Sequence, residues 1–473
     1  MLFSSVTFIL YFLPLVLLGY YCCPSFRIKN GILLFSSLFF YAWGEPVYVL
    51  VMIFSILLNY AVGMGLKGSG NSGPLRKGVL AIGVSLNLLL LFVFKYLSFF
   101  LEIVNAAFRP AGIPVLPGLR LLMPLGISFY TFQAISYLVD VYRSPSMAQE
   151  NPLDLGLYIA FFPQLIAGPI VRYHEIREQI LRRSHSLEKF SGGIERFIIG
   201  LAKKVLLANI MGEFADSVFA LPPGTASPYY LCLALLAYSF QIYYDFSGYS
   251  GMAVGLGLFF GFSLPENFDY PYASRSVREF WRRWHITLSS WFRDYLYIPL
   301  GGNRNGQART VRNLFIVFLI TGLWHGADWN FILWGLGHGL LLFLERIFGE
   351  RINRRIRDGA LKSVLSHVYT IAAVVFLWIF FRLGVEGGIG FLRGLGGGQD
   401  PADAVALQIL ADPRFYLVFT ACILSAFPWW RKIPVTRLRF PEILKKAVLL
   451  CLLVLSISAL ISDAYNPFIY FRF

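Results

Sequence analysis

One imidazole stands inside a stretch that otherwise suits the core of a lipid bilayer. His325 lies in Trp324-His325-Gly326, between the apolar runs 314–324 and 329–344. An ionisable side chain at such a depth is energetically costly, so its presence indicates a function. Desolvation favours the neutral imidazole, which can accept a proton at physiological pH. We therefore expect His325 to serve a membrane-embedded catalyst of proton transfer. The competing interpretation is a hydrogen bond to a neighbouring helix.

A second chemical constellation occupies residues 280–295. Written as one helix, this stretch places a histidine and several apolar side chains along one face: Trp281, His285, Leu288, Phe292 and Tyr295. Arg282, Arg283 and Arg293 lie largely off that face. The pattern is typical of an interfacial helix with aromatic rings at headgroup depth. It equally fits a helix in which His285 lines a cavity and the arginines attract an anionic donor.

Other polar groups lie within apolar runs. The stretch 241–250, which contains Asp245, is too polar to face lipid, so it lines a cavity or ties helices together. Pro163 and Pro169 interrupt the run 153–171, which predicts a broken or re-entrant helix. His338 lies on a different helical face from His325 and is the weaker candidate for chemistry. Solvated or structural roles are expected of the histidines in or near basic segments, which are His174, His185 and His367.

Composition identifies the environment of these groups. The 473 residues are 57% hydrophobic and only 14% charged, which is unusual for a soluble domain. The net charge of +15 resides in loops between apolar runs, a pattern typical of positive-inside topology and not of a nucleic-acid-binding surface. The five cysteines lie in or beside apolar segments without metal-ligand spacing, so we expect no metal site.

The apolar runs predict a multi-pass membrane protein. The first run, 2–21, has no basic residue before it and no cleavage site after it, so we expect a retained span. Further runs long enough to cross the membrane, singly or as split pairs, occupy 31–42, 47–64, 79–101, 121–141, 153–171, 194–220, 228–264, 311–345, 364–383, 413–429 and 446–463. We expect about 10–12 crossings, with some re-entrant or interfacial helices, in a single all-α domain over 1–473. The basic loops 172–189, 272–306, 349–362 and 431–446 fit on the cytoplasmic face.

Glycine spacing predicts where helices approach closely. Small residues four positions apart permit close contact between helices in a membrane. Pairs with this spacing are Gly251/Gly255, Gly257/Gly261, Gly322/Gly326 and Gly335/Gly339.

Several longer motifs carry a family resemblance. They are PQLIAGP at 163–169, YDFSGYS at 244–250, ENF at 266–268, the stretch 279–304 ending in LGGNR, and 322–339. With these motifs in order, and FIYF at 468–471, the chain resembles the membrane-bound O-acyltransferase (MBOAT) family, in particular its bacterial alginate O-acetylation branch. The resemblance implies a helical fold with a central tunnel that joins both membrane faces.

The resemblance also implies a reaction. His325 matches the catalytic histidine of the family, and His285 the second histidine of the bacterial branch. By analogy, acetyl-CoA is the cytoplasmic donor and no cofactor is bound. The acetyl group crosses the bacterial inner membrane, and a periplasmic SGNH-type partner, working with polysaccharide export machinery, places it on a polymer hydroxyl.

Roles for the individual residues follow from acyl-transfer chemistry. His325 would be the general base that deprotonates the attacking hydroxyl. The developing oxyanion needs a donor, for which His285, the Trp324 indole and Asn330 are candidates. We expect five polar or charged residues to contact the acyl donor or to line the tunnel: Trp324, Asn330, Arg282, Arg283 and Asp245. Tyr470 either passes the acyl group outward, as implied for a similar C-terminal element in related systems, or anchors the chain at the interface.

Two competing functions remain open at this stage. A related acyltransferase would transfer D-alanyl or another acyl group to cellulose, peptidoglycan or teichoic acid. A transporter would use buried ionisable residues as a relay, but it would also predict recognisable halves, which the sequence lacks.

Overall fold

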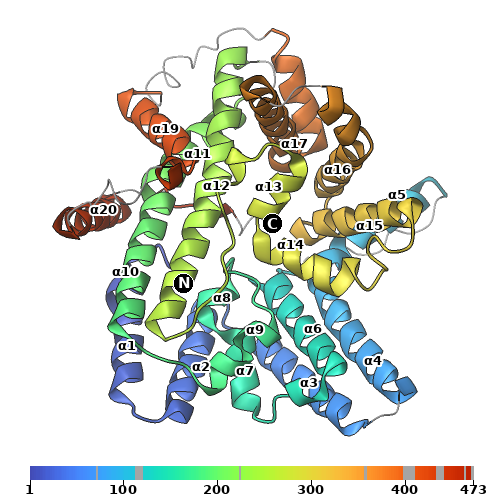
Figure 1. Ribbon diagram of the computed structural model, residues 1–473, viewed down its shortest axis with the longest axis vertical. Helices are drawn as coiled ribbons and strands as arrows, with labels where there is room; N and C mark the ends of the chain where they lie inside the picture. Colours follow the sequence, from blue (N-terminus) through green and yellow to red (C-terminus); the bar gives the residue numbers. More distant parts are fainter. Residues whose placement is uncertain are drawn as a thin grey trace. The chain divides into compact units, whose positions relative to one another are not determined.

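The computed structural model (Figure 1) describes residues 1–70, 73–111, 121–222, 225–355, 359–397, 411–432, 442–462 and 465–469. Within these ranges the secondary structure is helical and contains no strand, which confirms the all-α prediction. Among the described residues, five helices are long and apolar enough to cross a membrane: Val49–Gly68, Gly73–Phe108, Trp329–Gly349, Ala360–Gly394 and Glu442–Ser462. Two shorter apolar helices are Phe8–Cys22 and Pro413–Ser425. The expected 10–12 crossings stay a prediction.

The chain forms two compact units. Unit 1 comprises residues 1–194 and 253–265, and unit 2 comprises 195–252 and 266–473. The single domain expected over 1–473 stays a prediction. The predicted site residues that the structure describes all belong to unit 2.

Unit 1 contains the first ten α-helices, the last of which runs into unit 2. They are α1 (Leu13–Cys22), α2 (Phe26–Ala42), α3 (Val49–Gly68), α4 (Gly73–Leu91), α5 (Leu97–Phe108), α6 (Ile127–Arg143), α7 (Pro152–Ala160), α8 (Phe162–Leu165), α9 (Tyr173–Leu181) and α10 (Leu187–Ala202). Helix α6 packs against α3 and α4, and α2 packs against α7. The run 153–171 is broken between α7 and α8, as predicted, and is buried beyond its first residues.

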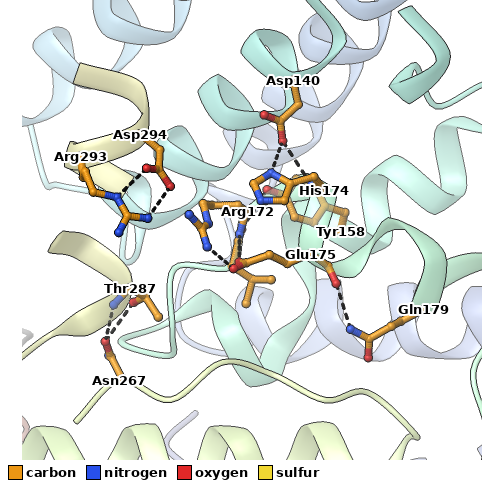
Figure 2. A network of polar contacts seen from close by, with 11 residues as sticks. Asp140, Tyr158, Arg172, His174, Glu175, Gln179, Asn267, Thr287, Arg293 and Asp294 are labelled. Carbon is orange, nitrogen blue, oxygen red and sulfur yellow. Dashed lines mark hydrogen bonds and ion pairs between the residues drawn. The ribbon is translucent and has the colours of Figure 1, made fainter. Parts of the chain in front are cut away.

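One predicted structural histidine ties α6 to α9. The Nδ1 atom of His174 lies 2.9 Å from a carboxylate oxygen of Asp140, which also accepts the backbone N–H of His174 at 3.2 Å (Figure 2). This hydrogen bond raises the pKa of His174 and favours the imidazolium beside the carboxylate. His174 therefore holds two helices together, in agreement with the structural role expected of it.

Unit 2 contains the helices that carry the predicted site. They are α11 (Asn209–Phe219), α12 (Pro228–Phe259), α13 (Val277–Arg283), α14 (Ile286–Phe292), α15 (Gln307–His325), α16 (Trp329–Arg355), α17 (Ala360–Gly394), α19 (Pro413–Ser425) and α20 (Glu442–Ser462). The part of α12 that belongs to unit 2 ends at Met252. A π-helical turn, η5 (Lys203–Ala208), joins α10 to α11. Such turns recur at functional sites because they redirect side chains within a helix.

Two glycine contacts fix helix positions in unit 2. A Cβ atom on Gly322 of α15 would overlap the carbonyl oxygen of Phe331 on α16, and Gly335 faces Gly322 in return. Figure 1 shows α15 and α16 side by side, and the glycines are the reason that this hairpin closes next to His325. Gly200 of α10 similarly meets Gly248 of α12 backbone to backbone. The close approach expected of Gly322 and Gly335 is therefore confirmed, although they contact each other across the hairpin.

Candidate functional site

His285 stands at a break between two short helices. Helix α13 ends at Arg283 and α14 begins at Ile286, so the single helix expected over 280–295 is wrong. His285 has φ 45° and ψ 54°, the left-handed conformation. Non-glycine residues rarely adopt this conformation, which costs free energy and is found most often at functional sites.

The break is stabilised by the loop 267–269. The Asp269 N–H donates to the Arg283 carbonyl at 2.9 Å, and the Ile286 N–H donates to the Asn267 carbonyl at 2.9 Å. The Asn267 side-chain oxygen accepts from the Thr287 N–H at 3.3 Å and from its hydroxyl at 2.9 Å (Figure 2). The loop thus supplies partners to backbone groups that a broken helix exposes, which is why the chain tolerates the break here.

Asn267 also fixes the tautomer of His285. Its side-chain oxygen is identified by the bond from the Thr287 N–H, which can only donate. The same oxygen lies 3.0 Å from Nδ1 of His285, so Nδ1 carries the proton. In the neutral ring Nε2 then holds a lone pair, and within the described residues no hydrogen-bond partner meets it. His285 is fully buried, and this lone pair can accept a proton.

Trp324 brings His285 and His325 into one aromatic cluster. The centroid of the Trp324 ring lies 5.7 Å from that of His285 and 4.8 Å from that of His325. Phe246 of α12 covers His285 edge-on at 4.7 Å. Trp334 and Phe381 contact His325 with centroids at 4.9 Å and 5.3 Å. Three residues predicted from two separate motifs therefore share one buried site, while their catalytic roles stay a prediction.

His338 belongs to the same aromatic region but is bound differently. The Trp281 indole N–H on α13 donates to Nδ1 of His338 on α16 at 3.2 Å. This bond joins two helices, which agrees with the interhelical role that we weighed for His338.

The other predicted residues lie around the cluster. Asn330 is buried in the first turn of α16, and its amide donates to the Phe381 carbonyl at 3.5 Å. Arg282 is exposed, whereas Arg283 forms an ion pair with Glu279 at 2.9 Å. Arg283 also donates to the carbonyl of Asp269 at 3.1 Å. Arg283 therefore supports the break at His285, and its predicted contact with the donor stays a prediction.

Asp245 has a partner that sequence reasoning missed. Its carboxylate lies 2.8 Å from the ammonium of Lys204 on η5, and both side chains are buried. The signal for Lys204 was present in the sequence as a lysine within the apolar run 194–220. Tyr470, the proposed relay, lies outside the described residues.

A cavity of about 600 Å³ opens beside this site. Asn267 and Tyr243 form part of its wall, and three basic residues contribute as well: Arg196, Lys203 and Arg431. This volume is typical of small-molecule sites. Arg196 forms an ion pair with Glu266, and Arg431 forms one with Asp269 at 2.8 Å. Sequence reasoning did not single out these basic residues.

Comparison with known proteins identifies the family of the chain. The family model described as MBOAT, membrane-bound O-acyltransferase family, matches residues 144–383. The chain is 39% identical to the probable alginate O-acetylase AlgI of Pseudomonas putida over the full length of both chains. The chain belongs to the MBOAT family. It is thus a multi-pass membrane O-acyltransferase that groups with alginate O-acetylases.

Two further relatives are similar to this MBOAT chain over most of its length. The probable alginate O-acetylase AlgI of Pseudomonas aeruginosa is 43% identical over 81% of this chain and 72% of its own length. The peptidoglycan O-acetyltransferase of Helicobacter pylori is 37% identical over 84% of this chain and 80% of its own length. MBOAT chains similar to this one thus carry names that specify different polymers.

Replacing Asn267 by Ala tests whether the orientation of His285 matters. We expect acyl transfer to fall about 10- to 100-fold, because the ring loses the partner that fixes its tautomer and position. Thr287→Val is the matched control. It removes the hydrogen bond from the Thr287 hydroxyl to the Asn267 side-chain oxygen but keeps the bond between that oxygen and His285. Transfer rates in purified membranes, normalised to protein amount, measure the difference. Equal rates in the two variants would contradict the orienting role.

Proposed function

We propose that this MBOAT protein transfers acetyl from cytoplasmic acetyl-CoA across the bacterial inner membrane for O-acetylation of an exported polysaccharide, alginate or a closely similar polymer. The observation that carries this proposal is the buried cluster of His285, Trp324 and His325. The identity to alginate O-acetylases over full length supports the acetyl group and the polymer class. The acceptor would receive acetyl through a periplasmic SGNH-type partner that works beside the export machinery.

The site provides the groups that acyl transfer requires. A hydroxyl oxygen attacks the thioester carbonyl carbon while its proton passes to an imidazole nitrogen. The carbon–sulfur bond then breaks, and the leaving thiolate takes up the proton. His325 is the proposed base from the family resemblance, and Nε2 of His285 is a second acceptor in its neutral form. The Trp324 indole N–H can only donate, so it is a better candidate than His285 for the hydrogen bond to the oxyanion.

The basic cavity supports a location for the donor. Coenzyme A carries phosphates, and in the lining of this cavity the basic Arg196, Lys203 and Arg431 outnumber the acidic Glu266 and Asp269. Asn267 lies in the same lining and contacts His285 directly. A thioester entering this cavity would therefore arrive beside the histidine cluster.

A second candidate polymer follows from one relative. The name of the Helicobacter pylori protein specifies peptidoglycan, so acetylation of peptidoglycan is the alternative function. Transfer of D-alanyl to teichoic acid is the more distant alternative. Ester-linked acetate measured on each envelope polymer, with and without the gene, identifies the acceptor.

His325→Ala tests the proposed function. We expect polymer acetate to fall at least about 100-fold, because the base is lost, while the protein accumulates as in the wild type. Ester acetate released by mild alkali and protein amount in isolated membranes are the two measurements. Wild-type acetate content at wild-type protein amount would refute the assignment of His325.

Neutralising the basic cavity wall tests donor entry. For Arg196→Gln combined with Lys203→Gln we expect KM for acetyl-CoA to rise about tenfold, because phosphate contacts are lost. The matched control is Arg282→Gln, which removes an exposed arginine that does not line this cavity. Steady-state kinetics in detergent measure both variants. A rise in KM for Arg282→Gln alone would instead support the original prediction that the 280–295 stretch binds the donor.

Tyr470→Phe tests the proposed acyl relay. If the phenol oxygen carries the acetyl group, its removal abolishes polymer acetylation while binding of the periplasmic partner persists. Polymer acetate and co-purification of the partner are measured together. Full acetylation by Tyr470→Phe would show that the residue serves only as an interfacial anchor.

A further inference from the structure

A short segment that follows α20 is bound inside unit 2. After α20, the segment Tyr465–Ile469 contacts α11, α12 and η5, and its last two residues, Phe468 and Ile469, are 3% and 6% exposed. The segment has no regular helix of its own before Ile469, so its backbone groups depend on side-chain partners.

Three polar side chains supply those partners, and a fourth binds the Tyr465 side chain. The carboxylate of Asp245 accepts the backbone N–H of Ile469 at 2.9 Å, and the Lys204 ammonium donates to the carbonyl of Pro467. The Asn209 amide donates to the carbonyl of Tyr465 at 3.1 Å, and the Tyr465 hydroxyl donates to Asp216 at 2.8 Å. Two backbone carbonyls and one amide of a five-residue segment are therefore held by buried groups.

The first two partners form an ion pair of their own. Lys204 and Asp245 lie 2.8 Å apart, and their side chains are 1% and 3% exposed. A buried pair is weak evidence for stability, because two charges lose their hydration. Here both members also bind the C-terminal segment, so the pair performs a task that two apolar side chains cannot perform.

One stretch of α12 connects this segment to the histidine cluster. Asp245 binds Ile469, and the next residue, Phe246, packs edge-on against His285. One turn further, the Tyr249 ring lies 4.4 Å from that of Phe468. The close contact of Gly248 with Gly200 sets this stretch of α12 against α10, which places Asp245 opposite Lys204.

We propose that Lys204 and Asp245 are positioning residues that hold the C-terminal segment 465–469 as a wall of the reaction centre. The pair acts on acetyl transfer only through this segment. The segment packs against the stretch of α12 in which Phe246 covers His285. This inference rests on the proposed function for its effect on acetyl transfer, but the binding of the segment is independent of any substrate.

The test removes both charges together. Replacing one partner alone leaves the other buried and unpaired, which destabilises the whole protein. The double variant K204M/D245L removes both charges and both bonds to the segment. A second variant, K204M/D245N, keeps a side-chain oxygen for the Ile469 N–H. The matched control is N59L/N87L, which removes a reciprocal pair of buried amides between α3 and α4, at 3.0 and 2.8 Å.

Hydrogen exchange measured by mass spectrometry reports binding of the segment in the full-length protein. We expect the amides of 465–469 to exchange at least about tenfold faster in K204M/D245L, while the helices of unit 2 keep their protection. K204M/D245N should stay close to wild type at Ile469, and N59L/N87L should not change this segment. Unchanged exchange in K204M/D245L would overturn the positioning role. If K204M/D245L does not accumulate, K204M/D245N decides the question. Faster exchange of the Asn466 and Phe468 amides in K204M/D245N supports the proposal, and unchanged exchange of these amides overturns it.

Kinetics of acetyl transfer then separate positioning from mere packing. We expect kcat to fall about tenfold in K204M/D245L with KM for acetyl-CoA unchanged, and K204M/D245N to recover most of the loss. Faster exchange with an unchanged kcat would show that the segment is no part of the reaction centre. A wild-type protein that transfers no acetyl group would refute the proposed function, while the exchange measurement would still decide whether the pair holds the segment.

Discussion

The side-chain oxygen of Asn267 is the interaction on which the site depends. It accepts three hydrogen bonds, from the His285 ring and from the amide and hydroxyl of Thr287. These bonds compensate for a helix that stops at Arg283 and restarts at Ile286. Without them, a buried histidine in the left-handed conformation would combine backbone strain with an unsatisfied polar ring. With them, the Nε2 lone pair of His285 is held within a buried aromatic cluster.

Local sequence patterns were sufficient for the helices and for some contacts. The apolar runs 228–264 and 311–345 became α12 and the α15–α16 hairpin. Gly322 and Gly335 marked a real close approach, since glycine spacing reports directly on how near two backbones can come. The prolines of the 153–171 run marked a real break for an equally local reason, the missing N–H of the ring.

The features that the sequence did not predict depend on contacts between distant residues. Periodicity favoured one helix over 280–295, because nothing within that stretch marks its interruption at His285. The cause lies in Asn267, on a loop that precedes the stretch and competes for its backbone groups. Asp245 was expected to be a polar residue of the interior, but its partner Lys204 lies 41 positions earlier, so spacing could not identify the pair. Cavity walls are similarly assembled from several elements, which is why Arg196 and Lys203 were missed.

The placement of Trp324 constrains how the two histidines can cooperate. Its ring contacts those of His285 and His325, and an indole offers one N–H donor and no nitrogen acceptor. A proton relay must both accept and donate a proton. Trp324 therefore cannot pass a proton from one imidazole to the other. Among the described residues no hydrogen-bond partner meets Nε2 of His285, so exchange between the histidines requires a further group, such as a substrate group or a water molecule. Because Nδ1 of His285 already donates to Asn267, only its Nε2 can take part, and a reacting hydroxyl must approach from that side of the ring. The carboxamide that permits the break in the helix thus also selects the direction from which chemistry at His285 can occur.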